Sequence, residues 1–195
     1  MKDYRFFVRA NRPIAQDIYQ MDLICWEQSF FEEARPGQFV HVKLPGSTAM
    51  ILRRPVSIHA VDREAKSLIL QYAVVGQGTA EMAALAEGTE LSVLGPIGNG
   101  YPLESHGRRV WLLGGGMGVA PLYSVAQYMR SNGGQVTAFL GWRDAAHAFG
   151  AEEFEHAGCK THLYTDDGSF GGAGFAVNGL LAALERGEKP DVIYA

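Results

Sequence analysis

A glycine-rich segment near the middle of the chain has the residue types and spacing of a phosphate-binding loop. Its residues are Gly114, Gly115, Gly116, Met117, Gly118, Val119, Ala120 and Pro121. It joins an apolar run at 110–113 to a segment with helical periodicity at 120–131. Glycines let backbone amides approach phosphate oxygens, and a helix start adds a favourable dipole. Proline replaces the third glycine of the G-x-G-x-x-G fingerprint. A strand-to-helix turn without a ligand is the alternative, but four glycines in five positions between a strand and a helix favour a phosphate.

Two adjacent arginines mark a second candidate site, the segment Arg53, Arg54, Pro55, Val56 and Ser57. A pair of guanidinium groups at the entrance of a strand can bind a pyrophosphate. The Ser57 hydroxyl can donate to, or accept from, a ring nitrogen of a flavin. The alternative is a pair of solvated arginines before the proline of an edge strand, and the segment taken alone favours that alternative.

A third glycine turn precedes a predicted helix at 79–86. Gly76 and Gly78 are two residues apart, and Thr79 follows at the predicted helix start. Backbone amides at such a start can contact a phosphate, although Thr79 as a simple N-cap explains this turn by itself. Tyr72, upstream of the turn, can either pack on a bound ring or fill the wall of a barrel. Three phosphate-type signals in one chain favour ligand binding more strongly than any one of them alone.

Polar and aromatic residues follow two predicted strands in the second half of the chain. Asp166 and Asp167 come after one strand, and Trp142 and Arg143 end another. Ligands of parallel α/β sheets bind at the carboxyl ends of strands, so the aspartates can bind a ribose, with an ordinary Asp-Gly turn as the alternative. The indole can wall an adenine pocket. Arg143 would accommodate the 2′-phosphate of NADP, whereas Asp144 would accept from a free ribose hydroxyl, and the sequence leaves both open.

The first half of the chain has the pattern of a small antiparallel β-barrel. Its β-branched and aromatic runs are short, several alternate in polarity, and turn residues separate them. The predicted strands are 6–8, 18–23, 39–44, 56–61, 67–75 and 90–94. The helix predicted over 79–86 stops at Gly88. These elements define a first domain over residues 1–101.

The second half alternates strands with helices, which is the pattern of a parallel sheet. The predicted strands are 110–113, 136–140, 161–165 and 191–194, and the predicted helices are 120–131, 152–156 and 176–185. Gly, Asn, Pro and Ser cluster at 98–107, so we place the second domain at 106–195. We therefore expect an antiparallel barrel followed by a Rossmann-like α/β domain. Because the chain stops after an apolar strand that no helix covers, we expect this domain to lack its final elements.

Composition argues against several classes of function. The net charge is −4 and the isoelectric point is near 5.9, so we expect no nucleic-acid partner. The 2 cysteines and 6 histidines show no metal-ligand spacing, and so few cysteines suit a reducing, cytoplasmic location. Charged residues at the start argue against a signal peptide. The uncharged run at 110–129 contains glycines and a proline, so we expect no membrane span.

Together these segments resemble the ferredoxin–NADP⁺ reductase superfamily, and more narrowly the electron-transfer subunits of the two-subunit, NAD-linked dihydroorotate dehydrogenases. The resemblance covers nearly the whole chain. It is carried by R-R-P-V-S at 53–57, V-L-G-P-I-G-N-G at 93–100, the glycine loop, F-G-A-E-E-F at 149–154 and T-D-D-G-S-F-G at 165–171. The second and the last of these segments are the more specific, because many families share the glycine loop.

The resemblance implies FAD in the groove between the domains and NAD(H) over the glycine loop. Arg54 would contact the FAD pyrophosphate, and Ser57, to which we assign the catalytic role, would lie at the isoalloxazine edge. The other expected FAD contacts are Arg53, Pro55, Val56, Gln71, Tyr72, Ala73, Gly78 and Thr79. The expected NAD(H) contacts are the loop from Gly114 to Pro121 with Trp142, Arg143, Asp166 and Asp167. The family often has arginine where this chain has Ala73, so one polar flavin contact is absent.

The resemblance also implies a partner. Electrons would leave dihydroorotate at an FMN in a catalytic dehydrogenase subunit and pass through a [2Fe–2S] cluster and FAD to NAD⁺, in a hetero-oligomer expected to be a heterotetramer. The family's C-G-P loop and four cluster cysteines lie beyond this sequence, so the cluster is expected only in a longer chain. The alternatives are a small FAD/NAD subunit of a bifurcating NADH–ferredoxin:NADP⁺ oxidoreductase or of a hydrogenase diaphorase, and a flavin-binding module without catalysis.

Overall fold

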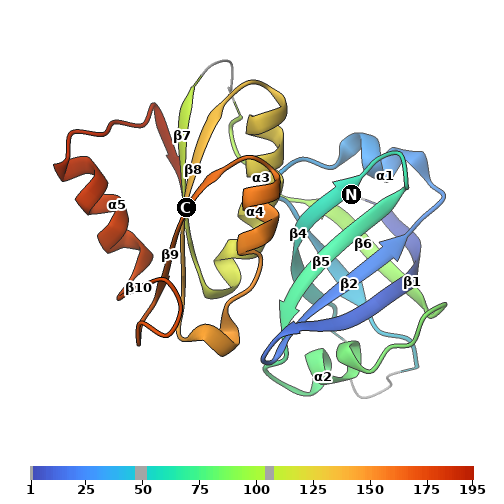
Figure 1. Cartoon of the computed structure of the whole chain (residues 1–195). Helices are drawn as coiled ribbons and strands as arrows, with labels where there is room; N and C mark the ends of the chain where they lie inside the picture. The colour runs from blue at the N-terminus through green and yellow to red at the C-terminus, as the bar shows by residue number, and fades with distance from the viewer. Residues whose placement is uncertain (1, 47–51, 104–107) are drawn as a thin grey trace. The chain divides into compact units, whose positions relative to one another are not determined.

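A computed structural model describes residues 2–46, 52–103 and 108–195 of the chain (Figure 1). Contacts divide the chain into two compact units, Met1–Gly100 and Tyr101–Ala195. Part of the predicted boundary at 98–107 lies at residues 104–107, outside the described residues, and so does the predicted start of the second domain at residue 106.

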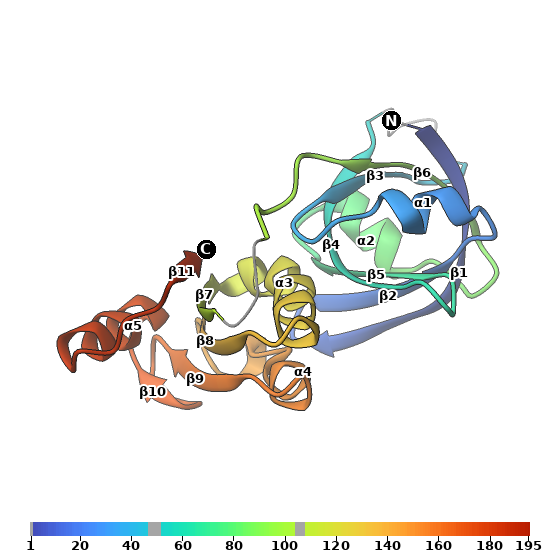
Figure 2. The same cartoon turned by 90° about the horizontal axis from the view of Figure 1, so that it is seen from above.

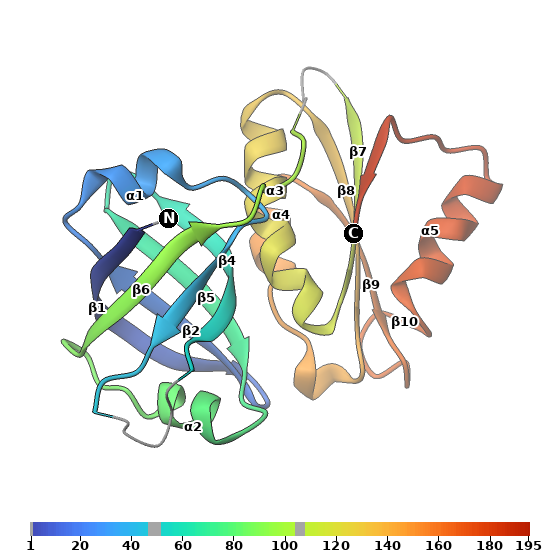
Figure 3. The same cartoon turned by 180° about the vertical axis from the view of Figure 1, so that it is seen from behind.

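The first unit is a closed six-stranded antiparallel barrel in the order β1-β2-β5-β4-β3-β6. Its strands are β1 (Lys2–Ala15), β2 (Ile18–Ile24), β3 (Phe39–Lys43), β4 (Arg54–Asp62), β5 (Ser67–Ala73) and β6 (Glu90–Ile97). Two short helices, α1 (Gln28–Glu33) and α2 (Gln77–Ala83), lie at opposite ends of the barrel (Figures 1 and 3). Closure pairs β1 with both β2 and β6, so the barrel has no open edge.

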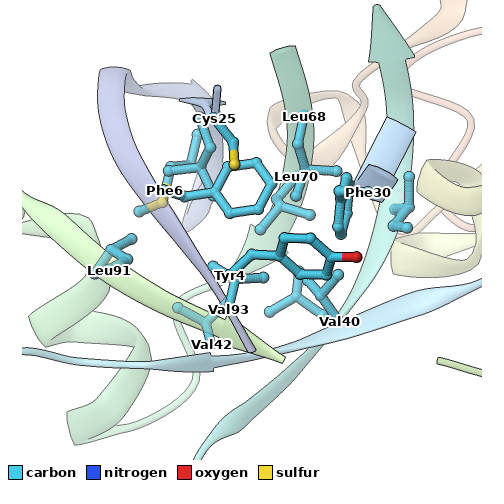
Figure 4. Close-up of a cluster of buried hydrophobic side chains, with 14 of the residues drawn as sticks. Tyr4, Phe6, Cys25, Phe30, Val40, Val42, Leu68, Leu70, Leu91 and Val93 are labelled. Carbon is cyan, nitrogen blue, oxygen red and sulfur yellow. The ribbon is translucent and has the colours of Figure 1, made fainter. Parts of the chain in front are cut away.

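The barrel interior is filled by side chains that alternate along the strands. Tyr4, Phe6 and Val8 of β1 are buried because successive residues of a strand face opposite sides. Helix α1 adds Phe30 and Phe31, both fully buried, at one end. The Phe30 ring packs edge-on against Tyr4 at 5.2 Å and Phe6 at 5.0 Å between centroids. Figure 4 shows Tyr4, Phe6 and Phe30 among the aliphatic side chains of this core.

The second unit is a five-stranded sheet in the order β10-β9-β8-β7-β11, and every strand pair in it is parallel. The strands are β7 (Arg109–Gly115), β8 (Gln135–Trp142), β9 (Lys160–Thr165), β10 (Gly172–Ala173) and β11 (Val192–Tyr194). The helices are α3 (Val119–Ser131), α4 (Ala151–His156) and α5 (Ala176–Glu185), with one-turn 3₁₀ helices η1 (Gly116–Gly118) and η2 (Ala145–His147).

Helices cover both faces of this sheet. Figures 1 and 2 show α3 and α4 on one face and α5 on the other. Beneath α5, Trp111 and Phe139 pack at 5.1 Å between ring centroids, and Leu180 and Ala183 of the helix complete a buried cluster. Parallel sheets are stable only when both faces are covered, so this layering is what the alternating strand and helix pattern requires. The expected barrel followed by a Rossmann-like α/β domain is confirmed.

Several element bounds differ from the prediction. Strand β1 begins at Lys2 rather than residue 6 and continues to Ala15, because pairing with two neighbours extends it through polar residues. Helix α2 is Gln77–Ala83 rather than 79–86, so the helix starts before Thr79. Helix α1 was not predicted, because six residues are too few to show a helical period.

Candidate functional site

The guanidinium of Arg54 lies at the start of helix α2 in the first unit. Arg54 opens β4, and its Nη1 donates to the carbonyl oxygen of Leu52 at 2.8 Å. A methyl group added to Gly78 would collide with Arg54 Nε and would lie 2.6 Å from Nη2 and 2.7 Å from Cζ. The glycine is therefore what lets the arginine approach the helix. A positive side chain beside backbone amides of a helix start forms a place for an anion.

Thr79 closes the same turn through its hydroxyl. Its Oγ accepts hydrogen bonds from the backbone amides of Val75 at 2.9 Å and Gly76 at 3.2 Å. The N-cap is Gly76, whose backbone is extended. The alternative prediction that Thr79 is the N-cap is therefore wrong, because Thr79 lies three residues further along the chain. The threonine instead folds back from the helix and holds the glycine turn in place.

Arg53 and Arg54 have different surroundings, although they are adjacent. Arg53 Nη2 donates to the carboxylate of Asp3 at 2.6 Å and to Ser92 Oγ at 2.9 Å. Its Nη1 donates to the carbonyl oxygens of His41 and Ser92 at 3.3 and 3.1 Å. Arg53 therefore ties the start of β4 to β1, β3 and β6, whereas the Arg54 side chain reaches the start of α2.

Strand β4 places Ser57 on the outer face of the barrel. Val56 belongs to the barrel core and is 7% exposed. Because side chains alternate along a strand, Pro55 and Ser57 face outward, and Ser57 is half-buried opposite Phe39 of β3.

Strand β5 carries three predicted cofactor contacts, Gln71, Tyr72 and Ala73, and places them on different faces of the barrel wall. Tyr72 is 3% exposed, packs in the barrel core, and donates its hydroxyl to Asn11 Oδ1 at 2.9 Å. Of the two roles considered for Tyr72, the structure therefore gives it the barrel wall. Its neighbours Gln71 and Ala73 face outward by alternation.

A buried polar row surrounds Gln71 on that outer face. The Gln71 amide donates to Gln20 Oε1 at 3.1 Å and lies 3.3 Å from His59 Nε2. Gln20 in turn donates to Asp22 at 3.1 Å. Gln71 and His59 are each 2% exposed. Gln20, Asp22 and His59 were not predicted as site residues. The signal that could have indicated them is polar residues at alternate positions of apolar strands.

The glycine loop of the second unit borders a cavity of about 420 Å³. Its lining is Leu113, Gly114, Gly115, Gly116, Gly141, Trp142, Arg143, Asp166, Phe175, Ala176 and Val177. Gly114 packs closely against the start of α3, because an added methyl would lie 3.1 Å from the Val119 Cα. At Gly115, Gly116 and Gly118 an added methyl would meet no described atom within 4 Å. These three glycines therefore leave open space at the start of α3, which is suited to a phosphate group.

The loop from Gly114 to Pro121 divides into two parts in the structure. Gly114, Gly115 and Gly116 line the cavity, and Gly116 also begins η1, which continues through Met117 and Gly118. Val119, Ala120 and Pro121 begin α3, so the proline falls within its first turn. Val119 and Ala120 are each 1% exposed and anchor the helix.

Trp142 and Arg143 lie at the carboxyl end of β8, and both line the cavity. The indole is 3% exposed, and among the described residues its N–H has no hydrogen-bond acceptor. Arg143 Nε donates to Asp144 Oδ2 at 3.0 Å, and His147 Nδ1 lies 2.5 Å from Asp144 Oδ1. The hydrogen bond from His147, then that from Arg143, lowers the pKa of Asp144 to about 2.

Asp166 and Asp167 follow β9, but only Asp166 lines the cavity. Asp167 Oδ1 accepts from the amide of Ser169 at 3.0 Å and from its hydroxyl at 2.6 Å, which lowers the pKa of Asp167. Ser169 Oγ also accepts from the amide of Ala145 at 2.8 Å, so this loop is joined to the loop after β8. The Asp-Gly turn at 167–168 is therefore present, and it positions Ser169.

The described residues contain no group of three or more His, Cys, Asp or Glu side chains that could hold a metal ion. Both cysteines of the chain, Cys25 and Cys159, are buried free thiols, and two cannot supply the four ligands of a [2Fe–2S] cluster. In the part of the chain that the structure describes, no helix is long and apolar enough to cross a membrane.

Solved structures place this fold in a class. An NADH-dependent reduced ferredoxin–NADP oxidoreductase, studied for flavin-based electron bifurcation, matches with a TM-score of 0.81 and 28% identity, over 96% of this chain and 65% of that one. The ferredoxin reductase of a carbazole 1,9a-dioxygenase matches in fold, with a TM-score of 0.80 and 19% identity, over 94% of this chain and 57% of that one. The chain therefore has the ferredoxin–NADP⁺ reductase-like fold.

Sequence comparison narrows the class to one family. The dihydroorotate dehydrogenase B (NAD⁺) electron transfer subunit of Enterococcus faecalis is 39% identical over 95% of this chain and 70% of its own length. That of Bacillus caldolyticus is 41% identical over 98% of this chain and 73% of its own length. No family model matches the chain. The chain belongs to the family of dihydroorotate dehydrogenase B electron transfer subunits, as the resemblance predicted.

Proposed function

We propose that this protein carries electrons between a dihydroorotate-oxidising partner subunit and NAD⁺, with FAD held by the first unit and NAD(H) by the second. The arrangement of Arg54 against Gly78 is the observation that carries the proposal, because it is a cationic cradle that a methyl group would fill. FAD, when bound, supplies the exchange between one-electron and two-electron transfer, so this chain needs no general base.

In the first unit, Arg54 binds the FAD pyrophosphate beside Gly78 and Thr79. The guanidinium supplies charge-assisted hydrogen bonds, and the bare Cα of Gly78 gives the phosphate and the arginine room at the same helix start. Arg53 positions this segment through Asp3 and Ser92.

Ser57, Gln71 and Ala73 face the flavin side of the barrel wall in this proposal. The Ser57 hydroxyl orients the isoalloxazine edge as donor or acceptor. Hydrogen bonds from Gln71 to Gln20 hold the glutamine amide in a single orientation. Pro55 adds an outward-facing apolar contact, while Val56 and Tyr72 support the wall from the core.

In the second unit, the loop from Gly114 to Pro121 binds the pyrophosphate of NAD(H). The space beside Gly115, Gly116 and Gly118 admits the phosphates to the start of α3. Trp142 and Asp166 wall the neighbouring cavity, where the adenosine half of the dinucleotide binds. Asp167 supports this wall indirectly, through Ser169.

The partner follows from the names of the relatives, which are electron transfer subunits of a dehydrogenase. We propose a hetero-oligomer with an FMN-containing catalytic subunit, arranged as a heterotetramer in the cytoplasm. The two cysteines of this chain do not fit a [2Fe–2S] cluster, so no step is assigned to one here.

Absorbance spectroscopy of the purified protein tests the proposal. The protein should be yellow, and NADH should bleach the flavin absorbance without oxygen. A yellow protein that NADH leaves unchanged would refute the enzymatic role and favour a flavin-binding module. Co-elution with the dihydroorotate-oxidising subunit is expected; co-elution only with another dehydrogenase would assign the chain to a different oxidoreductase.

A further inference from the structure

The chain leaves the first unit at Gly100, and the loop before β3 holds it there. Gln38 Nε2 donates to the carbonyl oxygen of Gly98 at 2.7 Å, while Gln38 Oε1 accepts the backbone amide of Arg35 at 2.7 Å. Gly100 packs against the same loop, because a methyl group added to it would lie 2.7 Å from the carbonyl oxygen of Pro36. The first unit therefore holds the chain up to its last residue.

Two tyrosines hold the chain on the other side of this boundary. Tyr194, the last residue of β11, is 5% exposed and donates its hydroxyl to the carbonyl oxygen of Pro102 at 2.8 Å. Tyr101 packs edge-on against Tyr194, with 5.3 Å between the ring centroids. The Tyr101 hydroxyl donates to the backbone oxygen of Ala195 at 3.2 Å. We call these contacts between residues 101–102 and 194–195 the tyrosine clasp.

The two sets of contacts meet at adjacent residues, Gly100 and Tyr101. Each unit holds its own part of the connecting chain, so a movement of one unit against the other falls on the backbone bonds at Gly100. Gly100 has a φ of +70°, which glycine adopts without strain, and glycine passes readily between backbone conformations. Hinges are a few residues that absorb large changes in φ and ψ. Gly100 therefore has the contacts and the residue type of a hinge.

The clasp lies at the edge of the second unit's sheet that carries the glycine loop. Strand β11 runs parallel to β7 with Tyr194 opposite Leu112, and β7 ends at Gly115 in that loop. Strand β8 lies on the other side of β7, so the strand order reverses at β7. Ligands of open α/β sheets bind at the carboxyl ends of strands beside such a reversal. The clasp therefore ties the chain that enters the second unit to the end of a strand beside the proposed nucleotide site.

We propose that Tyr101 and Tyr194 are positioning residues for electron transfer, because they confine movement between the two units to the hinge at Gly100. This inference rests on the proposed function, in which the first unit holds FAD and the second holds NAD(H). Groups on two linked units meet at an effective concentration that falls as the flexible link lengthens. Hydride transfer also depends on orientation, and a misplacement of about 1 Å can cost about a hundredfold in rate. Without the clasp, residues 101 and 102 would join the flexible link.

Three variants loosen the clasp by degrees. Tyr194→Phe and Tyr101→Phe each remove one hydroxyl and keep the ring, and Tyr101→Ala removes the ring contact as well. Tyr128→Phe is the matched control, because Tyr128 lies in the last turn of α3, which leads to the amino end of β8 at the opposite edge of the sheet. Urea unfolding shows whether each variant is folded.

Double electron–electron resonance tests the mechanical part of the proposal without any cofactor. Nitroxide labels on cysteines introduced at Glu64 and Glu185, one exposed position on each unit, report the distribution of distances between the units in the full chain. The native thiols are buried and should stay unlabelled. The distribution should be broader in Tyr101→Ala than in the wild type, intermediate in the two phenylalanine variants, and unchanged in the control.

Anaerobic stopped-flow reduction of the FAD-loaded full chain by NADH tests the functional part. At saturating NADH, the rate constant of flavin reduction in Tyr101→Ala should fall about tenfold, and Tyr101→Phe should recover most of it. The dissociation constant for NAD⁺, from titration calorimetry, should keep its wild-type value, because the nucleotide site belongs to the second unit alone. A variant that merely distorted that site would raise the dissociation constant instead.

Three results would overturn the inference. A distance distribution that Tyr101→Ala leaves unchanged would show that the clasp does not confine the hinge, whatever the cofactors do. A broader distribution with a wild-type rate of flavin reduction would refute the positioning role and leave the proposed function intact. Wild-type protein that NADH does not reduce would instead refute the proposed function, and the positioning role with it, even where the label distances change as expected.

Discussion

Replacing Gly78 with alanine should weaken FAD binding without destabilising the protein. The substitution adds one methyl at the second residue of α2. The carbon of this methyl would lie 2.6 Å from Arg54 Nη2. The Gly78 backbone does not have the left-handed conformation that favours glycine, so alanine fits the helix. The methyl should therefore displace the end of the arginine side chain and leave the helix in place.

The two effects have opposite signs. Alanine is favoured over glycine inside a helix by about 0.5–1 kcal/mol, and moving the end of a flexible side chain costs little, so the apoprotein should be as stable as the wild type or slightly more stable. A hydrogen bond to a charged group contributes about 1.5–3 kcal/mol. Its loss should weaken FAD binding by about tenfold to a hundredfold.

Flavin titration of the apoprotein, followed by fluorescence quenching, measures the affinity, and urea unfolding measures the stability. Gly76→Ala is the control, because its methyl would meet no described atom within 4 Å and its φ of −174° is ordinary extended backbone. Arg54→Ala should weaken FAD binding similarly, and the double variant with Gly78→Ala should be no weaker than Arg54→Ala alone. Wild-type FAD affinity in Gly78→Ala would refute the assignment of Arg54.

Three further predictions concern the second unit. Gly171→Ala should destabilise the protein by about 2–4 kcal/mol in urea unfolding, because the Gly171 φ is +75° and the added methyl would collide with the Leu163 carbonyl oxygen. Gly187→Ala is the control, because its φ is also positive, +85°, but its methyl would meet open space; it should cost only about 1–2 kcal/mol. The pKa of Asp144 is lowered in the folded protein, so the ionised carboxylate should stabilise the fold fully above the pKa of an unfolded aspartate, about 3.9. This contribution should decline as the pH falls toward 2, so the difference in unfolding free energy between the wild type and Asp144→Asn should narrow over that range. Burial raises the pKa of Cys159 to about 11, so iodoacetamide should alkylate this thiol at pH 8 only after unfolding, as mass spectrometry can show.

Local patterns predicted the elements well where they are long and periodic. Helix α5 was predicted at 176–185 and has those bounds, and α3 begins one residue before its predicted start. Both helices bury one face on the sheet, so their apolar residues recur at helical spacing. The glycine loop also lies between a strand and a helix as predicted, because its turn chemistry is local.

Contacts between distant segments could not be predicted in the same way. Two adjacent arginines look equivalent in the sequence, yet Arg53 is tied to Asp3, fifty positions away, and Arg54 reaches Gly78. Tyr72 was expected at the cofactor, but the register of β5 turns it into the barrel core. One residue of strand register decides which face a side chain occupies, and that register depends on the neighbouring strands.

The sequence by itself therefore determined the fold class, the family and the segments that carry the candidate site, since these depend on periodicity and turn residues that are continuous along the chain. Tertiary structure alone decided the roles of single side chains. The pairing of Arg143 with Asp144 and His147, and its connection to Ser169, depends on two loops that parallel strands bring to the same edge of a sheet. Such proximity is a property of the packed chain, because the residues concerned are separated by an entire helix and strand.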